Sequence, residues 1–195
     1  LCSSIRNYFN MRKKGKLYFI LDNLKTLIGA LIIALLIRSF LVQPFYIPSS
    51  SMEPTLLVGD RIFVSKLTYG YSKHSFPFSP NFSNKRFFSR APTQGDLVVF
   101  KTPADNRTDY IKRLIGLPGD EIQFINGELI INGNKINRKP IKVVEPIRCG
   151  NFLLKTNTFI ETLPNGVKHF VTYRKEGTLQ NTKKYVVPKN HYFLM

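Results

Sequence analysis

The feature that most constrains the fold of this 195-residue chain is its one long apolar run. The run extends from Leu24 to Val42, a length of 19 residues. At 1.5 Å per residue, such a helix just crosses the hydrocarbon core of a bilayer. Lys25 and Arg38 lie near its two ends, where long basic side chains reach the lipid headgroups. The run therefore predicts one transmembrane helix over residues 27–42, starting as early as residue 24.

Three interpretations of this run compete. A cleaved secretory signal has a basic start and a short apolar core, but no small-x-small cleavage pattern follows here; the chain continues with Gln43-Pro44-Phe45-Tyr46. A buried core helix lacks any nearby amphipathic partner. A retained signal-anchor is favoured. The Lys and Arg excess in residues 1–26 then places the N-terminus in the cytoplasm and residues 43–195 outside it.

The formal net charge of +17 raises the question of a nucleic-acid partner. The basic side chains are scattered, without an RNA-recognition signature or zinc-finger spacing, so no nucleic acid is expected. The charge indicates a solvated basic surface or one attracted to anionic lipid headgroups. Cys2 and Cys149 fall on opposite sides of the predicted membrane, which excludes an internal disulfide. No Cys/His cluster has metal-ligand spacing, so neither metal nor other cofactor is expected.

After Val42 the pattern is typical of β-structure, and no segment shows a 3.6-residue apolar stripe over three turns. Asn126-Gly127 separates two apolar runs and suits the positive φ angles of a type I′ hairpin turn. A second pair, Asn132-Gly133, extends that hairpin to a meander. We expect a mainly β domain with strands over residues 61–65, 96–100, 121–125, 128–131, 159–161, 167–173 and 185–187.

Residues 70–94 interrupt this pattern with Pro, Ser and aromatic residues that have no periodicity. Such composition predicts a long loop, and loops of this length are usually functional or disordered. Its phenylalanines either pack onto the β domain or lie, with the basic residues, at the bilayer interface.

Two segments carry candidate chemistry. Three consecutive serines, Ser49–Ser51, precede Met52-Glu53-Pro54-Thr55-Leu56 just past the membrane exit. Farther along, Lys112 lies in an apolar run, with Tyr110, Ile111, Leu114 and Ile115 around it. Burial would keep its amine neutral, and a neutral lysine can activate a serine. The simpler alternative is a lysine on the solvent face of a strand. Arg113 is always protonated and cannot be the base. The residues alone leave all three serines open as nucleophile.

From about Leu27 to its end, the chain resembles the bacterial type I signal peptidases, or leader peptidases. Four boxes agree in order and spacing: residues 43–48, the serine box at 49–56, residues 95–101, and residues 110–113 with 116–120. The resemblance implies a signal-peptidase-like β-barrel or sandwich catalytic domain after one transmembrane helix. It implies a serine endopeptidase of the bacterial inner (plasma) membrane, with its catalytic domain on the periplasmic side. Its partners would be the lipid bilayer and exported preproteins, cut after Ala-x-Ala-type signal sequences.

The resemblance also assigns roles to residues. Ser51 is the nucleophile and Lys112 the general base of an acyl-enzyme mechanism. The backbone N–H of Ser51 and the hydroxyl of Ser49 form the oxyanion hole. The shallow apolar pockets for small substrate residues match Phe45, Ile47, Pro48, Met52, Leu56, Ile62, Val99, Tyr110 and Ile111.

In the family, a further box, Gly-Asp-Asn-Arg-Asp-Asn-Ser followed by Asp and Arg, begins after a Tyr-Phe-x-Met sequence. Here Tyr192-Phe193-Leu194-Met195 are the last residues. We therefore expect the domain over residues 43–195 to be C-terminally incomplete, and the 195-residue chain to have little or no activity by itself.

Other functions fit less well. A self-cleaving repressor also uses Ser and Lys, but it would lack the apolar run and carry a DNA-binding module. A Ser–His protease is disfavoured because none of the three histidines lies in a matching motif. The non-enzymatic alternative is a basic, membrane-tethered β domain that binds lipid or a partner. It explains the anchor and the charge, but it does not explain why the serine box at 49–56 occurs together with the lysine box at 110–113.

Overall fold

The computed structural model describes residues 2–72, 75, 86–141, 147–149, 152–154, 156–174 and 180–195. The chain divides into two compact units. One comprises residues 1–43 and 65–89, and the other comprises residues 44–64 and 90–195.

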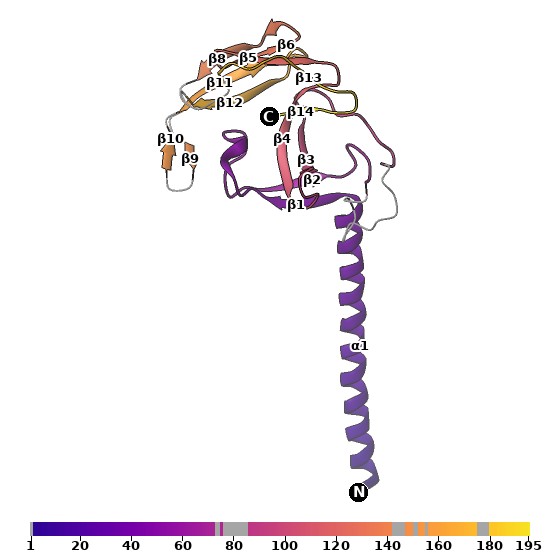
Figure 1. The fold of residues 1–195 in the computed structure, drawn as a ribbon. Coiled ribbons are helices and arrows are strands. Elements are labelled where there is room, and N and C mark those ends of the chain that lie inside the picture. Colours follow the sequence, from indigo (N-terminus) through magenta and orange to yellow (C-terminus); the bar gives the residue numbers. More distant parts are fainter. Residues whose placement is uncertain are drawn as a thin grey trace. The chain divides into compact units, whose positions relative to one another are not determined.

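The first unit is dominated by the helix α1, Cys2–Phe40 (Figure 1). Its segment Tyr18–Phe40 has 23 residues and a mean hydropathy of 2.0, and its large apolar side chains are exposed rather than covered by protein. By length and composition this segment can cross a bilayer. The predicted N-terminal apolar helix is therefore confirmed, although the apolar segment begins at Tyr18, before residue 24, and the helix ends before Val42. The helix also continues through the basic segment.

Part of the predicted 70–94 loop belongs to the same unit. Tyr71 and Phe87 form an isolated antiparallel bridge that joins two distant points of this segment. Tyr71 also donates its hydroxyl to the carbonyl of Phe40 at 2.8 Å. Residues 73–74 and 76–85 lie outside the described residues. The side chain of Phe88 is 90% exposed, and the placement of such phenylalanines at a bilayer interface stays a prediction.

The second unit is built of antiparallel strands, labelled in Figure 1. One three-stranded sheet has the order β14-β4-β3 and another β12-β11-β8; a four-stranded sheet has the order β13-β5-β6-β7. Two-stranded sheets pair β1 with β2 and β9 with β10. The bounds are β1 Val42–Tyr46, β2 Arg61–Ser65, β3 Leu97–Lys101, β4 Asp109–Gly116, β5 Glu121–Ile125, β6 Glu128–Ile131, β7 Asn134–Lys135, β8 Asn137–Ile141, β9 Ile147–Cys149, β10 Phe152–Leu154, β11 Thr156–Thr162, β12 Lys168–Arg174, β13 Tyr185–Val186 and β14 Phe193–Leu194.

The core of this unit follows from strand alternation. In β5 and β6 every second side chain is buried, which turns one apolar face inward. The buried cluster consists of Ile115, Ile122, Phe124, Leu129, Ile131, Ile136, Leu163 and Val187, with Tyr173, Phe193 and Met195 packed against it. The mainly β fold class is confirmed.

The predicted meander is also confirmed. Asn126 and Gly127 have φ angles of 51° and 72°, the positive pair of a type I′ turn between β5 and β6. Asn132 and Gly133, with φ angles of 53° and 76°, make the second turn, between β6 and β7. The other predicted strands are present within one to three residues at either end. The strands that were not predicted are β1, β4, β8, β9, β10 and β14, and in β4 the apolar pattern is interrupted by Lys112 and Arg113.

Candidate active site

The three serines lie in the turn that follows β1. Ser49 is extended (φ −131°, ψ 151°), and Ser50–Met52 form the short 3₁₀ helix η1. Backbone hydrogen bonds from Glu53 N–H to Ser50 O (3.1 Å) and from Leu56 N–H to Met52 O (3.0 Å) close the turn. The side chain of Met52 is buried, whereas Ser51 is exposed. The methionine therefore anchors the turn and leaves the serine before it at the surface.

Two hydroxyls of this turn face each other. The Oγ atoms of Ser49 and Ser51 are 3.4 Å apart, at the outer limit of a hydrogen bond. A group that bound the Ser51 oxygen would also lie near the Ser49 hydroxyl. This proximity is what an assisting donor beside a nucleophile requires.

Lys112 lies in β4, directly opposite Val98 of β3. Because side chains alternate along a strand, Tyr110 and Leu114 share its face, while Ile111 and Ile115 lie on the other face. This corrects the sequence-based expectation that all four surround the amine. Lys112 is half-buried, and burial lowers the pKa of its amine below the ordinary value of 10.5. Within the described part of the chain, its amine has neither a hydrogen-bond partner nor an ion pair.

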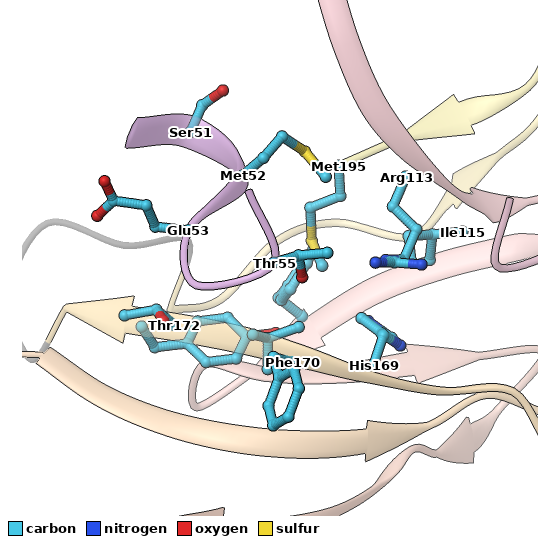
Figure 2. Close-up of a pocket in the computed structure, with 13 residues that line it drawn as sticks. Ser51, Met52, Glu53, Thr55, Arg113, Ile115, His169, Phe170, Thr172 and Met195 are labelled. Atoms are coloured by element: carbon cyan, nitrogen blue, oxygen red, sulfur yellow. The ribbon is translucent and has the colours of Figure 1, made fainter. Parts of the chain in front are cut away.

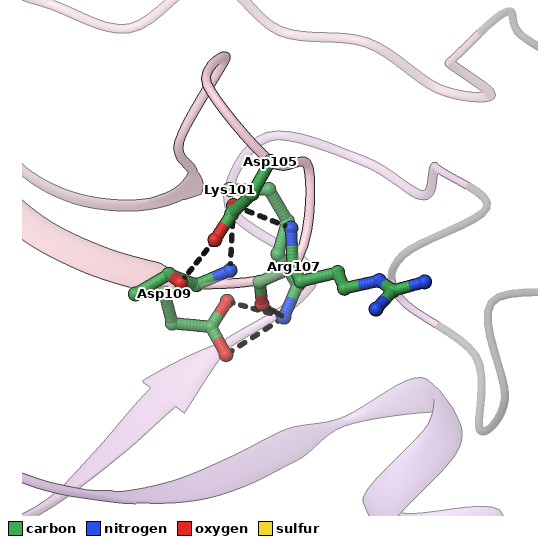
Figure 3. A network of polar contacts seen from close by, with 5 residues as sticks. Lys101, Asp105, Arg107 and Asp109 are labelled. Carbon is green, nitrogen blue, oxygen red and sulfur yellow. Dashed lines mark hydrogen bonds and ion pairs between the residues drawn. The ribbon is translucent and has the colours of Figure 1, made fainter.

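The far end of the β3–β4 hairpin is held by a polar network, drawn in Figure 3. The amine of Lys101 lies 2.8 and 2.9 Å from the two carboxylate oxygens of Asp109. The same amine donates to the carbonyl of Arg107 at 2.7 Å. Asp105 accepts hydrogen bonds from the backbone N–H groups of Arg107 (2.8 Å) and Thr108 (3.0 Å). The network fixes the turn between Lys101 and Asp109, which lies three residues before Lys112.

The structure does not join the two predicted catalytic side chains by a hydrogen bond. Among the described residues, the Ser51 hydroxyl has Ser49 as its partner, and no hydrogen bond links it to Lys112. The roles of Ser51 and Lys112 therefore remain predictions.

A pocket of about 220 Å³ opens beside the serine turn. Figure 2 shows the turn on one side of the pocket and β12 on the other, with Met52 directed toward Met195 and the hydroxyl of Ser51 directed away from His169. Its lining residues are Ser51, Met52, Glu53, Thr55, Arg113, Ile115, Phe124, His169, Phe170, Val171, Thr172, Tyr173 and Met195. Arg113 and Ile115 line this pocket, and side chains alternate along a strand. The face of β4 that is turned toward the pocket is therefore the face opposite to Lys112.

Of the residues predicted to bind substrate, only Met52 lines this pocket. Val99 and Ile111 are cross-strand partners in the β3–β4 ladder. Ile47 is buried, with 3% of its surface exposed, and Tyr110 is 49% exposed. Phe45, Pro48, Leu56 and Ile62 lie in or near β1, the serine turn and β2. Their substrate roles stay predictions.

The pocket also contains residues that sequence reasoning did not single out. His169 and Tyr173 come from β12, and Tyr173 contacts Glu161 of β11. The two-residue alternation of the predicted strand 167–173 is the signal that could have put His169 and Tyr173 on one face, but no motif marks them. Arg113 donates to the carbonyl of Gly95 at 2.7 Å. Among the described residues, no carboxylate pairs with Arg113.

Burial perturbs several of these groups. It raises the pKa of the Glu161 carboxyl, which is fully buried. It lowers the pKa of His169 to about 4, with a smaller contribution from the charge of Arg113. It raises the pKa of Tyr173, helped by the neighbouring Glu161. In the described residues, no group of three or more His, Cys, Asp and Glu side chains is arranged to hold a metal ion.

Comparison with known proteins places these features in a family. A sequence model described as signal peptidase, peptidase S26, matches residues 20–195. Signal peptidase I of Rickettsia typhi is 41% identical over 174 residues, which cover 84% of this chain and 64% of the relative. Signal peptidase I of Rickettsia felis is 42% identical over 178 residues, covering 84% and 63%. That of Rickettsia bellii is 40% identical over 181 residues, covering 88% and 61%.

The chain thus spans somewhat less than two thirds of the length of these curated relatives. The family match covers nearly all of the apolar helix segment, the serine turn, Lys112 and every strand that the structure describes. The chain belongs to the signal peptidase family, peptidase S26.

Proposed function

We propose that this protein is a membrane-anchored serine endopeptidase that removes signal peptides from exported preproteins after Ala-x-Ala-type sites. Membership in the signal peptidase family supports the reaction. The helix segment Tyr18–Phe40 supports the anchor. The proposed orientation is a cytoplasmic N-terminus and an extracytoplasmic domain, residues 43–195, at the bacterial plasma membrane.

The observation that carries the proposal is the partial burial of Lys112, which lowers the pKa of its amine. A surface lysine is protonated at neutral pH and cannot accept a proton. Here the amine is half-buried on its strand face, no carboxylate among the described residues pairs with it, and burial lowers its pKa. A serine needs such a neutral base to become a nucleophile.

In the proposed mechanism, the Ser51 oxygen attacks the carbonyl carbon of the scissile bond while its proton passes to the Lys112 amine. The Ser51 N–H and the Ser49 hydroxyl stabilise the developing oxyanion. The protonated Lys112 then gives its proton to the leaving amine, the C–N bond breaks, and an ester on Ser51 remains. A water attacks this ester while one of its protons passes to Lys112. The ester C–O bond then breaks, Lys112 returns the proton to the Ser51 oxygen, and the signal peptide leaves with a free carboxyl group.

The position of the serine suits the substrate. Ser51 follows the apolar run, which ends at Val42, by nine residues. A signal peptide inserted in the same bilayer presents its cleavage site close to the membrane surface. The small apolar pockets are proposed to be formed by the predicted substrate-binding residues, Met52 among them.

The test measures cleavage of a preprotein with an Ala-x-Ala site in detergent. It compares this chain, a form extended by the family box expected after Met195, and the extended form with Lys112→Ala. Lys184→Ala is the matched control, because that lysine is exposed and pairs with Glu121 at 3.3 Å. We expect cleavage by the extended form and by its Lys184→Ala control, and none by its Lys112→Ala variant. If the extended wild type does not cut while it binds anionic liposomes, the tethered binding domain replaces this proposal.

A further inference from the structure

A row of polar side chains crosses the sheet β12-β11-β8. Glu161 in the central strand is directly opposite His169 on one side and Arg138 on the other. Glu161 is fully buried and His169 is 5% exposed. Buried groups of this kind need hydrogen-bond partners, because water no longer supplies them.

Only some of the polar atoms of Glu161 and His169 have a hydrogen-bond partner. Tyr173 donates its hydroxyl to Oε1 of Glu161 at 3.1 Å. The second oxygen, Oε2, lies 3.8 Å from Nε2 of His169. Among the described residues, Oε2 and both ring nitrogens of His169 lack a hydrogen-bond partner. A shift of about 1 Å brings Oε2 and Nε2 within hydrogen-bond distance, and one of the two atoms must then carry the proton.

The surroundings decide which atom carries it. Burial raises the pKa of Glu161, and the Tyr173 hydrogen bond and the charge of Arg138 oppose this only in part. Burial, and then the charge of Arg113, lower the pKa of His169. A neutral acid beside a neutral imidazole is therefore favoured over an ion pair.

Arg138 does not neutralise Glu161. Its guanidinium pairs with Glu128 at 3.4 Å and donates to the carbonyl of Gly127 at 2.9 Å. The same guanidinium lies 4.7 Å from the ring centre of Phe159. The charge of Arg138 is thus shared with Glu128 and with the rings of Phe159 and Tyr173, the latter 5.4 Å away.

We propose that Glu161 is a positioning residue for the pocket beside the Ser51 turn, acting as a protonated acid that donates a hydrogen bond to His169 and accepts one from Tyr173. Nε2 of His169 is then the acceptor, and the neutral ring carries its proton on Nδ1. His169 and Tyr173 both line the pocket, and Figure 2 shows His169 on the wall opposite the turn. Glu161 itself does not line the pocket.

The neutral form matters because of Arg113. Arg113 and His169 line the same pocket, and Arg113 is the neighbour of Lys112 in β4. An imidazolium would place a second cation near the guanidinium and push the two strands apart. A hydrogen-bonded neutral pair keeps β12 and β4 in place around the Ser51 turn. The effect on catalysis rests on the proposed function; the protonation of Glu161 does not.

The first test is independent of activity. Nitrogen-15 NMR of histidine-labelled protein, with His169 assigned by its loss in His169→Gln, reports the tautomer directly. We expect a neutral ring protonated at Nδ1 at pH 7, with no imidazolium until the pH is well below the ordinary histidine pKa of about 6.5. A His169 imidazolium, or a neutral ring protonated at Nε2, at pH 7 overturns the proposal.

The second test compares Glu161→Gln with Glu161→Leu in the extended form. Glutamine reproduces the protonated acid, since its carbonyl accepts from Tyr173 and its NH₂ donates to His169, whereas leucine fills the space without either bond. We expect Glu161→Gln to retain kcat, and Glu161→Leu to lower kcat about tenfold or more with KM nearly unchanged.

Melting temperatures of both variants at pH 6 and 8 accompany the kinetics. Glu161→Gln should be at least as stable as wild type at pH 8. If Glu161→Gln is as damaging as Glu161→Leu in stability and in kcat, the carboxylate form is required and the proposal fails. If the extended wild type is itself inactive, the proposed function fails, and the NMR and stability results still decide the protonation of Glu161.

Discussion

Lys112 owes its properties to the strand face on which it lies. Val98 is directly opposite it, and Tyr110 and Leu114 flank it on the same face, so the amine is only partly reached by water. Burial penalises the charged form of the amine and lowers its pKa. A neutral amine is then available at a pH where an exposed lysine remains protonated.

The pH dependence of cleavage tests this directly. Because the pKa of Lys112 is lowered, the neutral fraction grows as pH rises through a midpoint below 10.5. We expect kcat/KM of the extended form to rise with pH through that midpoint. Lys112→Arg should lose about 10²–10⁴-fold at every pH, because a guanidinium does not deprotonate. A Lys112→Arg variant with near-wild-type activity would exclude Lys112 as the base.

Ser49 offers a second test at the residue scale. Its hydroxyl is 3.4 Å from that of Ser51 and is proposed to stabilise the oxyanion. Removing one such donor typically lowers the rate by about 10²–10³-fold. Ser49→Ala should therefore be slow in the preprotein assay while KM changes little, and Ser49→Thr should recover part of the rate. Equal rates for Ser49→Ala and wild type would remove Ser49 from the site.

His169 adds a prediction about stability. Its pKa in the folded protein is about 4, below the ordinary value of 6.5. Because this pKa is lower in the folded protein than in the unfolded chain, the contribution of His169 to stability is fully present above pH 6.5. As pH falls from 6.5 toward 4, the unfolded chain binds a proton at this histidine before the folded protein does, so stability is lost. His169→Gln should weaken that acid-side loss in chemical denaturation. An unchanged pH dependence would mean that His169 titrates as it does in the unfolded chain.

At the element scale, β4 is positioned by the residues just before β3. The N–H of Gly95 donates to Leu114 O at 2.7 Å, and Leu114 N–H donates to Asp96 O at 2.8 Å. The carbonyl of Gly95 also accepts from the Arg113 guanidinium at 2.7 Å. This segment thus holds the strand that carries Lys112 and Arg113.

Gly95 permits that arrangement for two reasons, and its substitution tests both. Its φ is +97°, and a Cβ there would lie 2.8 Å from a methyl group of Val167. Gly95→Ala should cost about 1–3 kcal/mol in urea denaturation, from backbone strain together with the close contact. Gly133→Ala is the control, because its φ is +76° but nothing lies within 4 Å. Equal costs would show that the contact with Val167 contributes nothing.

The β5-β6-β7 meander is a part of the fold that local sequence predicts. Asn-Gly pairs predicted both turns of the β5-β6-β7 meander, because positive φ is a property of those residues and needs no distant contact. The surroundings of Lys112 are predicted only in part. Tyr110 and Leu114 share its strand face, whereas Ile111 and Ile115, which are also near neighbours in sequence, lie on the other face.

At the scale of the whole molecule, the proposed orientation is open to a simple experiment. The basic N-terminal segment and residues 43–195 should lie on opposite sides of the membrane. Protease added to intact spheroplasts should degrade the domain and leave a tag fused before residue 1 protected; lysis should expose the tag. A tag that is cut in intact spheroplasts would reverse the orientation.

The sequence by itself determined the apolar helix, the mainly β character, the meander and the family boxes. Each depends on a local property: hydropathy over one helix length, the period of a strand, the φ of a turn, or residues adjacent in one box. It also identified Ser51 and Lys112 as candidates through the resemblance, and their roles stay predictions.

Only the tertiary structure decided which side chains share a face or a pocket. Arg113 of β4, His169 and Tyr173 of β12, and Met195, which follows β14, are far apart in the chain and line one pocket. The register of β11 with β12 and β8 places Glu161 between His169 and Arg138. Such encounters depend on strand pairing and on burial, which remove water from polar groups and change their charge. No local pattern in the sequence contains that information, because the energy of a buried group is set by the neighbours that the fold brings to it.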